Sequence, residues 1–265
     1  MIELDNVQQE LGYVIKFKQW EAVLRITEPG SKLSKTVAGK MSGLARDFEQ
    51  WKTIYEVSDS GSKLKQIAFN RISKMATNFE QLEIVFNEAA FDEKLERVTV
   101  EKMVELATTF EQWEVIYNVS DSSSKLENKS IEKMVELATT FEQWEILYGI
   151  SNTNPAFENI GFKSMIKMLD LAITFEQWDT IYECAKFGGS ALNKMLELAH
   201  TFEQWKIIHD RVVSNSMVGI NSLNAMLESA ETIEQLAIVY KEAFLGTVLE
   251  KVALDRLFKL VNVVD

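Results

Sequence analysis

The sequence predicts an all-α fold, an α-solenoid of about eight helix–turn–helix repeats, each about 31 residues long. The first supporting observation is a four-residue motif, FEQW or a close variant, that recurs along the whole chain. The second is that residues 100–118 and 131–149 match at 15 of 19 positions, which indicates duplication. The third is the rarity of helix breakers, with 2 prolines and 11 glycines among 265 residues.

The motif is regularly spaced. Its copies begin at residues 17, 48, 79, 110, 141, 175, 202 and 233, so that successive starts lie 31, 31, 31, 31, 34, 27 and 31 residues apart. A fixed period between about 20 and 50 residues is typical of repeat architectures, in which each unit buries its apolar face against its neighbours. We therefore expect residues 1–265 to form one continuous helical-repeat domain.

A helix is expected to begin at every motif. In seven copies a capping residue directly precedes the motif, and a glutamine stands three residues after that capping residue. The capping residues are Asp47, Asn78, Thr109, Thr140, Thr174, Thr201 and Thr232. In this capping-box spacing the capping side chain accepts a hydrogen bond from the amide of the glutamine, and the glutamine side chain reaches back to the amide of the capping residue. The glutamate of each motif lies in the first turn, where the helix dipole favours a negative charge.

The motif helix presents one apolar face. With the first motif residue counted as position 0, apolar residues recur at positions 0, +3, +6 and +7, as in Phe110, Trp113, Ile116 and Tyr117. This spacing corresponds to one face of an α-helix. We expect the resulting ladders of Trp and Tyr to point into the core; the alternative is a surface row that stacks against sugars or bases.

A second helix is expected upstream of each motif. Apolar residues recur at positions −10, −7, −4 and −3, as in Ile131, Met134, Leu137 and Ala138. We predict a helix of about 12–16 residues, a tight turn, and then a motif helix of about 10–12 residues. The upstream pattern occurs once more near the C-terminus, so a terminal helix is expected at about 248–263, either as a cap or as part of a longer array.

The turn and the motif helix, as in TTFEQWEILY (139–148), resemble the second helix of tetratricopeptide-type repeats, where an aromatic residue also follows a capping residue at the helix start. This resemblance implies a right-handed superhelix of helical hairpins with a concave binding face. The chain departs from that family in its period, and it carries Trp where tetratricopeptide repeats have a small residue.

A ladder of basic residues is the principal candidate for a ligand-binding site. Position −8 is basic in six successive copies, at Lys40, Arg71, Lys102, Lys133, Lys167 and Lys194. Along the flank of the upstream helices, these side chains could track a phosphate backbone or an acidic peptide. We favour local pairing instead, because position −5 is acidic in most copies and i,i+3 pairs of this kind stabilise a helix slightly.

One region departs from the regular spacing. The interval from Phe141 to Phe175 gains three residues, around 151–162, and the next interval loses four, around 184–190. A changed linker alters how neighbouring repeats stack. Region 151–190 is therefore expected either to bend the array or open a pocket, or to be a loop that has drifted without consequence.

The sequence contains no recognisable catalytic or metal-binding pattern. The motifs HExxH, CxxC, GxSxG and GxxxxGK[ST] are all absent. The two histidines, His200 and His209, belong to the same repeat, and the single cysteine, Cys184, is interpreted as an inert core thiol. We therefore expect no enzymatic activity, no cofactor and no bound metal.

Composition limits the partners. A formal net charge of −12 repels phosphate backbones and anionic lipids in general, which disfavours nucleic acid. No stretch approaches about 18 consecutive apolar residues, and the N-terminus lacks the basic and apolar regions of a signal peptide. We therefore expect a cytoplasmic protein that does not associate with membranes.

Two functions are consistent with these features. The first is a non-catalytic scaffold that binds a protein or peptide on an extended concave surface, by analogy with other solenoids. The second is a modular nucleic-acid-binding repeat protein that uses the basic ladder. We favour the first, because the chain is acidic and most ladder residues have acidic neighbours.

Overall fold

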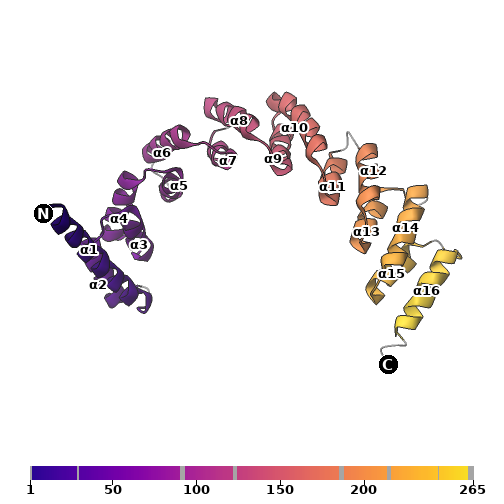
Figure 1. The fold of residues 1–265 in the computed structure, drawn as a ribbon, viewed down its shortest axis with the longest axis horizontal. Coiled ribbons are helices and arrows are strands. Elements are labelled where there is room, and N and C mark those ends of the chain that lie inside the picture. The colour runs from indigo at the N-terminus through magenta and orange to yellow at the C-terminus, as the bar shows by residue number, and fades with distance from the viewer. Residues whose placement is uncertain are drawn as a thin grey trace. The chain divides into compact units, whose positions relative to one another are not determined.

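The computed structural model describes residues 2–28, 30–89, 93–121, 124–184, 188–213, 216–243 and 245–261, and for residues 2–12 it describes the backbone only. Within these residues the fold is all-helical, with sixteen α-helices, one short 3-10 helix and no strand (Figure 1). The chain divides into two compact units, Met1–Leu137 and Ala138–Asp265.

The first unit contains α1 to α8. After α1, motif helices alternate with the upstream helices that precede each motif, and α3, α5 and α7 are the motif helices. Their bounds are α1 Ile2–Arg25, α2 Lys32–Ser42, α3 Phe48–Val57, α4 Lys63–Met75, α5 Phe79–Glu88, α6 Glu93–Leu106, α7 Phe110–Asn118 and α8 Lys125–Leu137.

The second unit contains α9 to α16 and the 3-10 helix η1. Its motif helices are α9, α11, α13 and α15. The bounds are α9 Phe141–Thr153, η1 Pro155–Phe157, α10 Glu158–Leu171, α11 Phe175–Glu183, α12 Gly188–Leu198, α13 Phe202–Arg211, α14 Met217–Ser229, α15 Ile233–Glu242 and α16 Val248–Val261. The helix expected at 248–263 is thus present as α16, and residues 262–265 lie outside the described residues.

All seven predicted caps are confirmed. Each capping side chain accepts a hydrogen bond of 2.8–3.3 Å from the amide of the glutamine three residues later. The glutamine oxygen accepts from the amide one residue before the cap at 2.7–3.1 Å in every copy. In four copies it also accepts from the capping residue itself at 3.3 Å. The reciprocal capping box is thus confirmed in four copies, and in these the glutamine fixes one more residue of the connection than a simple capping box requires.

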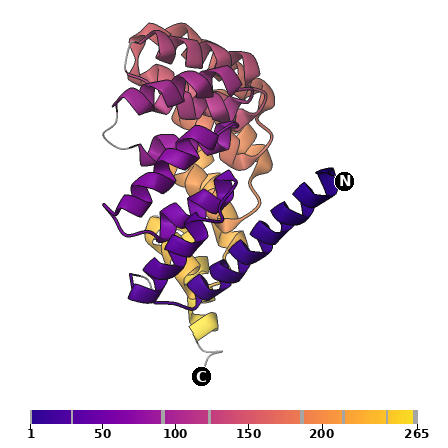
Figure 2. The same cartoon turned by 90° about the vertical axis from the view of Figure 1, so that its left-hand side faces the viewer.

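The prediction of a helix start is wrong at the first motif. α1 runs unbroken from Ile2 to Arg25, so Phe17 lies inside a helix, and Figure 2 shows α1 as one long helix. The residue before this motif is Lys16, whose side chain has no hydrogen-bond acceptor. With no capping side chain to hold the backbone in an extended conformation, the helix continues through the motif.

Each motif helix packs most extensively against the helix that follows it, and much less against the helix that precedes it.

The predicted tight turn before the motif is in fact a short extended connection. Ala172 has φ −67° and ψ 124°, and Thr174 has φ −103° and ψ 161°. In each unit the motif helices form one layer and the upstream helices form the other (Figure 1).

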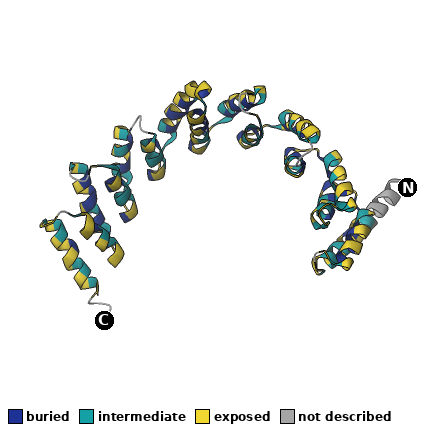
Figure 3. Cartoon of the chain, turned by 180° about the vertical axis from the view of Figure 1, so that it is seen from behind, coloured by how far each residue is buried: buried dark blue, intermediate teal, exposed yellow. Residues whose placement is uncertain are grey.

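The core lies between these two layers, and Figure 3 shows the buried residues where the helices face one another. Position +6 of the motif helix is at most 1% exposed in all seven copies from α3 onward, and position −7 of the upstream helix, a methionine in six of seven copies, is 0% exposed. Position −11 is also buried and is always Val or smaller: Val37, Ala68, Thr99, Ser130, Ser164, Ala191 and Ser222. These small residues allow neighbouring helices to approach closely.

The expectation for the aromatic ladders holds in part. Trp51, Trp113 and Trp144 are buried at 4–6% exposure, whereas Trp178 and Trp205 are only half-buried. Four of the five tyrosines at position +7 are half-buried as well, and the fifth, Tyr240, is exposed. Position +6 occupies the centre of the buried face, and the tyrosines at position +7 lie at its edge, whereas His209 at the same position of α13 is buried at 4% exposure.

Candidate functional site

The basic ladder lies on the exposed flank of the upstream helices. Lys40, Arg71, Lys102 and Lys133 belong to the first unit, and Lys167 and Lys194 belong to the second. Five of the six are exposed and Lys133 is half-buried. These positions agree with the expected flank location, and ligand binding by the ladder stays a prediction.

The predicted i,i+3 pairing is present at two ladder positions. Lys133 pairs with Glu136 at 2.6 Å and Lys194 pairs with Glu197 at 2.7 Å. The Arg71 guanidinium instead lies 5.7 Å from the centre of the Trp51 ring. Among the described residues, no carboxylate forms an ion pair with the remaining three, Lys40, Lys102 and Lys167.

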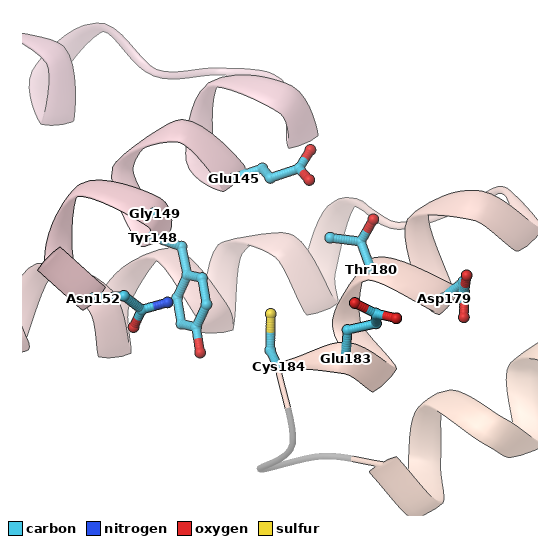
Figure 4. Close-up of a pocket in the computed structure, with 8 residues that line it drawn as sticks. All are labelled: Glu145, Tyr148, Gly149, Asn152, Asp179, Thr180, Glu183 and Cys184. Carbon is cyan, nitrogen blue, oxygen red and sulfur yellow. The ribbon is translucent and has the colours of Figure 1, made fainter. Parts of the chain in front are cut away.

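A groove of about 640 Å³ opens between α9 and α11 in the motif-helix layer of the second unit. Figure 4 shows the side chains that line it, which are Glu145, Tyr148, Gly149 and Asn152 from α9 and Asp179, Thr180, Glu183 and Cys184 from α11 and its end. The α9 side of the groove lies in the irregular interval between the motifs at 141 and 175, and the α11 side follows it. For region 151–190 the sequence predicted either a bend or pocket, or a neutral loop.

Two local features account for the groove. The three added residues extend α9 to 13 residues, whereas α7 and α11 have 9, and this places Asn152 beside α11. Position +8 is Gly149 here, and a Cβ built on it meets no atom within 4 Å. The two preceding copies have Asn87 and Asn118 at this position, so α9 lacks a side chain that they carry.

The wall of the groove is acidic and is organised by one arginine. Arg211, at the end of α13, reaches both oxygens of Asp179 at 3.2 and 3.3 Å and also pairs with Glu183. Its backbone oxygen accepts a hydrogen bond of 3.0 Å from the Tyr182 hydroxyl. Among the described residues Glu145 forms no ion pair, so the groove offers an uncompensated carboxylate.

Cys184 is half-buried in the groove, which corrects its interpretation as a core thiol. Burial raises its pKa, and the charges of Glu145 and Glu183 raise it further, while a hydrogen bond with Tyr148 opposes them. The pKa of Tyr148 is also raised, first by burial and then by Cys184. Both groups therefore stay protonated near neutral pH, and the thiol is a poor nucleophile there.

Charge is unevenly distributed between the two layers. Within the helix bounds, the motif helices of the first unit have net charges of −1, −3 and −2 for α3, α5 and α7. Those of the second unit have −2, −3, 0 and −1 for α9, α11, α13 and α15. Each unit therefore has −6 in this layer.

The upstream helices do not share this negative charge. Their net charges are +3, +4, −1 and 0 for α2, α4, α6 and α8, and 0, 0, −1 and +1 for α10, α12, α14 and α16. The sequence interpretation used the net charge of −12 for the whole chain. Counting charges by helix type would have found the separation.

No group of three or more His, Cys, Asp or Glu side chains in the described ranges is arranged so that it could hold a metal ion. None of the described helices combines the length and the apolar character that crossing a bilayer requires. The absence of a cofactor remains an expectation from the sequence.

Comparison with protein-family models, curated proteins and solved structures gives no match.

Proposed function

We propose that this chain is a non-catalytic scaffold that binds a protein or peptide partner. In this proposal the helices form a right-handed solenoid of eight repeats of about 31 residues, with α16 as a C-terminal capping helix. The partner contacts the motif-helix layer, and its contacting segment is rich in Lys or Arg. Glu145, Asp179 and Glu183 contact it in the groove.

The separation of charge between the layers is the observation that carries this proposal. A layer with a net charge of −6 in each unit raises the local concentration of a cationic segment and repels an anionic one. The groove adds a recess with an unpaired carboxylate and a tyrosine ring, and a lysine or arginine side chain can use both.

The chemistry of the groove supports binding rather than catalysis. Its one thiol has a raised pKa, and neither histidine lines it. Two of its three carboxylates, Asp179 and Glu183, are held in ion pairs with Arg211.

Peptide binding measured by fluorescence anisotropy tests this function. We expect a labelled Lys/Arg-rich peptide to bind, with an affinity that falls as salt rises, and a peptide of the same length rich in Asp and Glu not to bind. Equal binding of both peptides, or binding of neither, would contradict the proposal.

Two variants locate the binding in the groove. Gly149→Asn introduces the side chain found at this position in two other copies, so it should preserve the fold and weaken binding by filling the groove. Glu145→Gln should weaken binding by up to about fivefold, as expected for one exposed ion pair. Asp170→Asn, on the exposed surface of α10, is the matched control and should have no effect.

Nucleic-acid binding is the second candidate, and the exposed, unpaired state of Lys40, Lys102 and Lys167 is the observation that favours it. A salt titration of binding to a fluorescent poly-pyrimidine strand tests it. Sub-micromolar binding near physiological salt, lost when Lys102, Lys133, Lys167 and Lys194 are all changed to Gln, would replace the scaffold proposal. We expect weak or undetectable binding.

A further inference from the structure

A second recess opens in the first unit, between the ends of α1 and α3, with a volume of about 340 Å³. Leu24 near the end of α1 and Val57 at the end of α3 line it, together with Glu56 of α3. Asp59, in the connection that follows α3, also lines it and pairs with Lys35 of α2 at 2.8 Å. All of the lining belongs to the first unit, and the volume lies within the range of ligand-binding pockets.

The recess occupies the same place in the repeat as the groove of the second unit. Counted from its motif, Leu24 is at position +7, and Tyr148 is at this position in the groove. Positions +8 and +9 of the next motif helix line both sites: Glu56 and Val57 in the recess, Glu183 and Cys184 in the groove. Each unit therefore has a hollow between the ends of two successive motif helices.

A tyrosine contact that other copies make at this place is missing from the recess. In two pairs of motif helices the tyrosine hydroxyl at position +7 donates to the residue at position +9 of the next motif helix: Tyr55 to the Glu88 carboxylate at 2.5 Å, and Tyr182 to the Arg211 backbone oxygen at 3.0 Å. Leu24 has no hydroxyl, so it cannot be joined to Val57 in this way. The recess lies between these two residues, which both line it.

The hydroxyl groups of the lining favour a cation over an anion. Those of Thr27, Ser34 and Ser58 each donate to a backbone oxygen three or four residues earlier, at 2.8, 3.0 and 2.6 Å. A hydroxyl has one proton, so none of the three has a proton left with which to hold an anion. Their oxygens and the carboxylate of Glu56 are acceptors, and a cationic group can use them.

The remaining lining suits a side chain with an apolar stem and a cationic end. Leu24 and Val57 supply apolar surface, and both charged residues of the lining, Glu56 and Asp59, are acids. Lys52 Nζ lies 3.9 Å from Glu56 Oε1, beyond hydrogen-bond distance, so this carboxylate has room for a closer donor. We propose that the recess is a second binding site of the chain and takes a lysine or arginine side chain of the basic partner. The choice of a basic partner rests on the proposed function, whereas the recess itself does not.

NMR of the full chain with labelled leucine and valine methyl groups tests the proposal, with the Lys/Arg-rich peptide as the probe. We expect the peptide to shift the methyl signals of Leu24 and Val57 in the wild type, and also in Gly149→Asn, which alters only the groove of the second unit. The peptide rich in Asp and Glu should shift neither signal.

The outcomes separate this site from the proposed function. If the basic peptide binds the wild type and leaves the Leu24 and Val57 signals unmoved, or if Gly149→Asn abolishes all binding, this site is refuted and the proposed function stands. If the wild type does not bind the basic peptide, both are refuted.

Leu24→Tyr closes the recess with a side chain that the repeat already uses, since five other copies have tyrosine at position +7. Its hydroxyl can donate to Val57 O as Tyr182 donates to Arg211 O, so the variant should fold and lose the peptide-induced shift of Val57. Phe86→Tyr is the matched control, because it adds a tyrosine at position +7 of α5, which lines neither site. A folded Leu24→Tyr protein that keeps the Val57 shift would overturn the proposal.

Removal of charge supplies a second measurement, made in the Gly149→Asn protein so that it reports on the recess. Glu56→Gln should raise the Kd of the basic peptide by up to about fivefold, as for one exposed ion pair. Glu49→Gln, on the exposed surface two turns earlier in α3, should leave the Kd unchanged. Equal effects of the two substitutions would mean that the peptide senses the charge of α3 as a whole, and the recess would not be its site.

Discussion

The regular stretch of α7 and α8 and the irregular stretch of α9 to α12 share one motif but differ in what surrounds it. Trp113 is buried with Lys129 5.5 Å from its ring centre, and the Ser130 hydroxyl donates to Leu126 O at 2.9 Å. In the irregular stretch Trp144 is covered in the same way by Lys163, but Trp178 is only half-buried.

The difference shows where the repeat accommodates a change of length. Positions +6 and −7 stay fully buried in both stretches, as Ile116 and Met134 and as Ile181 and Met195 show. The extra and missing residues are taken up at the far end of the motif helix and the start of the next upstream helix. The groove lies at that end of the motif helix, so it forms while the core residues at positions +6 and −7 stay buried.

The largest expected effect concerns the two tryptophans of the irregular stretch. Trp144→Ala should lower the free energy of unfolding by about 3–5 kcal/mol, as for other large-to-small core changes. Trp178→Ala should cost less, because this side chain is already half-exposed and loses less buried area. Chemical denaturation of both variants measures the difference.

Glu145→Ala is the control for Trp144→Ala, since Glu145 is the next residue and is exposed. Its effect should lie within about 0.5 kcal/mol of the wild type. If the Trp144→Ala and Glu145→Ala proteins unfolded at the same denaturant concentration, Trp144 would not lie on the buried face of α9.

Residue patterns predicted the regular part of the fold well, because its determinants are local. A capping side chain and a glutamine three residues later determine a helix start by hydrogen bonds within one turn, and this held wherever a capping residue was present. It failed at Phe17, where Lys16 offers no acceptor. The pairing of each motif helix with the following helix was missed, because it depends on the extended backbone of the connection.

The groove could be located by sequence only to a region. Its walls come from α9 and α11, which begin 34 residues apart, and its depth depends on the absence of a side chain at Gly149. Neither the facing of two helices nor the space between them follows from a periodic pattern.

The basic ladder was placed correctly on an exposed flank, because a flank position follows from helical periodicity alone.

The second prediction concerns a close contact between α9 and α10. A Cβ on Gly161 would lie 2.3 Å from Ser151 Oγ and 3.0 Å from Ser151 Cβ, so Gly161→Ala should destabilise by about 1–3 kcal/mol despite the better helix propensity of alanine. Thermal melts measure this cost. Ser151→Ala should relieve part of it when combined with Gly161→Ala.

Gly39→Ala in α2 is the control for the second prediction. A Cβ there meets no atom within 4 Å and Gly39 lies inside the helix, so the substitution should stabilise by about 0.5–1 kcal/mol. Equal destabilisation by both glycine substitutions would point to a general intolerance of side chains rather than to contact with Ser151.

The third prediction compares two serines at position −11. The Ser164 hydroxyl is buried and has no hydrogen-bond partner among the described residues, whereas the Ser130 hydroxyl has one. Ser164→Ala should therefore stabilise by about 1 kcal/mol, and Ser130→Ala should be neutral or destabilise by up to about 1 kcal/mol. Alanine is already present at this position in two copies, Ala68 and Ala191, so it fits the space.

The smallest expected effect concerns two glutamates that link successive motif helices of the second unit. The pKa of Glu142 is lowered first by its own backbone amide at the helix start and then by Gln177, whose Nε2 donates to it at 3.1 Å. The pKa of Glu176 is lowered by its own backbone amide, against the effect of burial, and also by Gln204 at 3.4 Å.

The sign of the pH dependence follows from these lowered pKa values. A carboxyl whose pKa is lower in the folded state contributes stability above its unfolded pKa, and this stability is lost as the pH falls through the folded pKa. We therefore expect the melting temperature to begin falling below about pH 5, near the upper end of glutamate titration.

NMR titration of the side-chain carboxyls can resolve the two sites. Gln177→Met should raise the pKa of Glu142 and leave that of Glu176 unchanged, and Gln204→Met should do the reverse. If each variant moved both pKa values together, the shifts would come from the helix starts alone, and the glutamine contacts between α9, α11 and α13 would not be formed in solution.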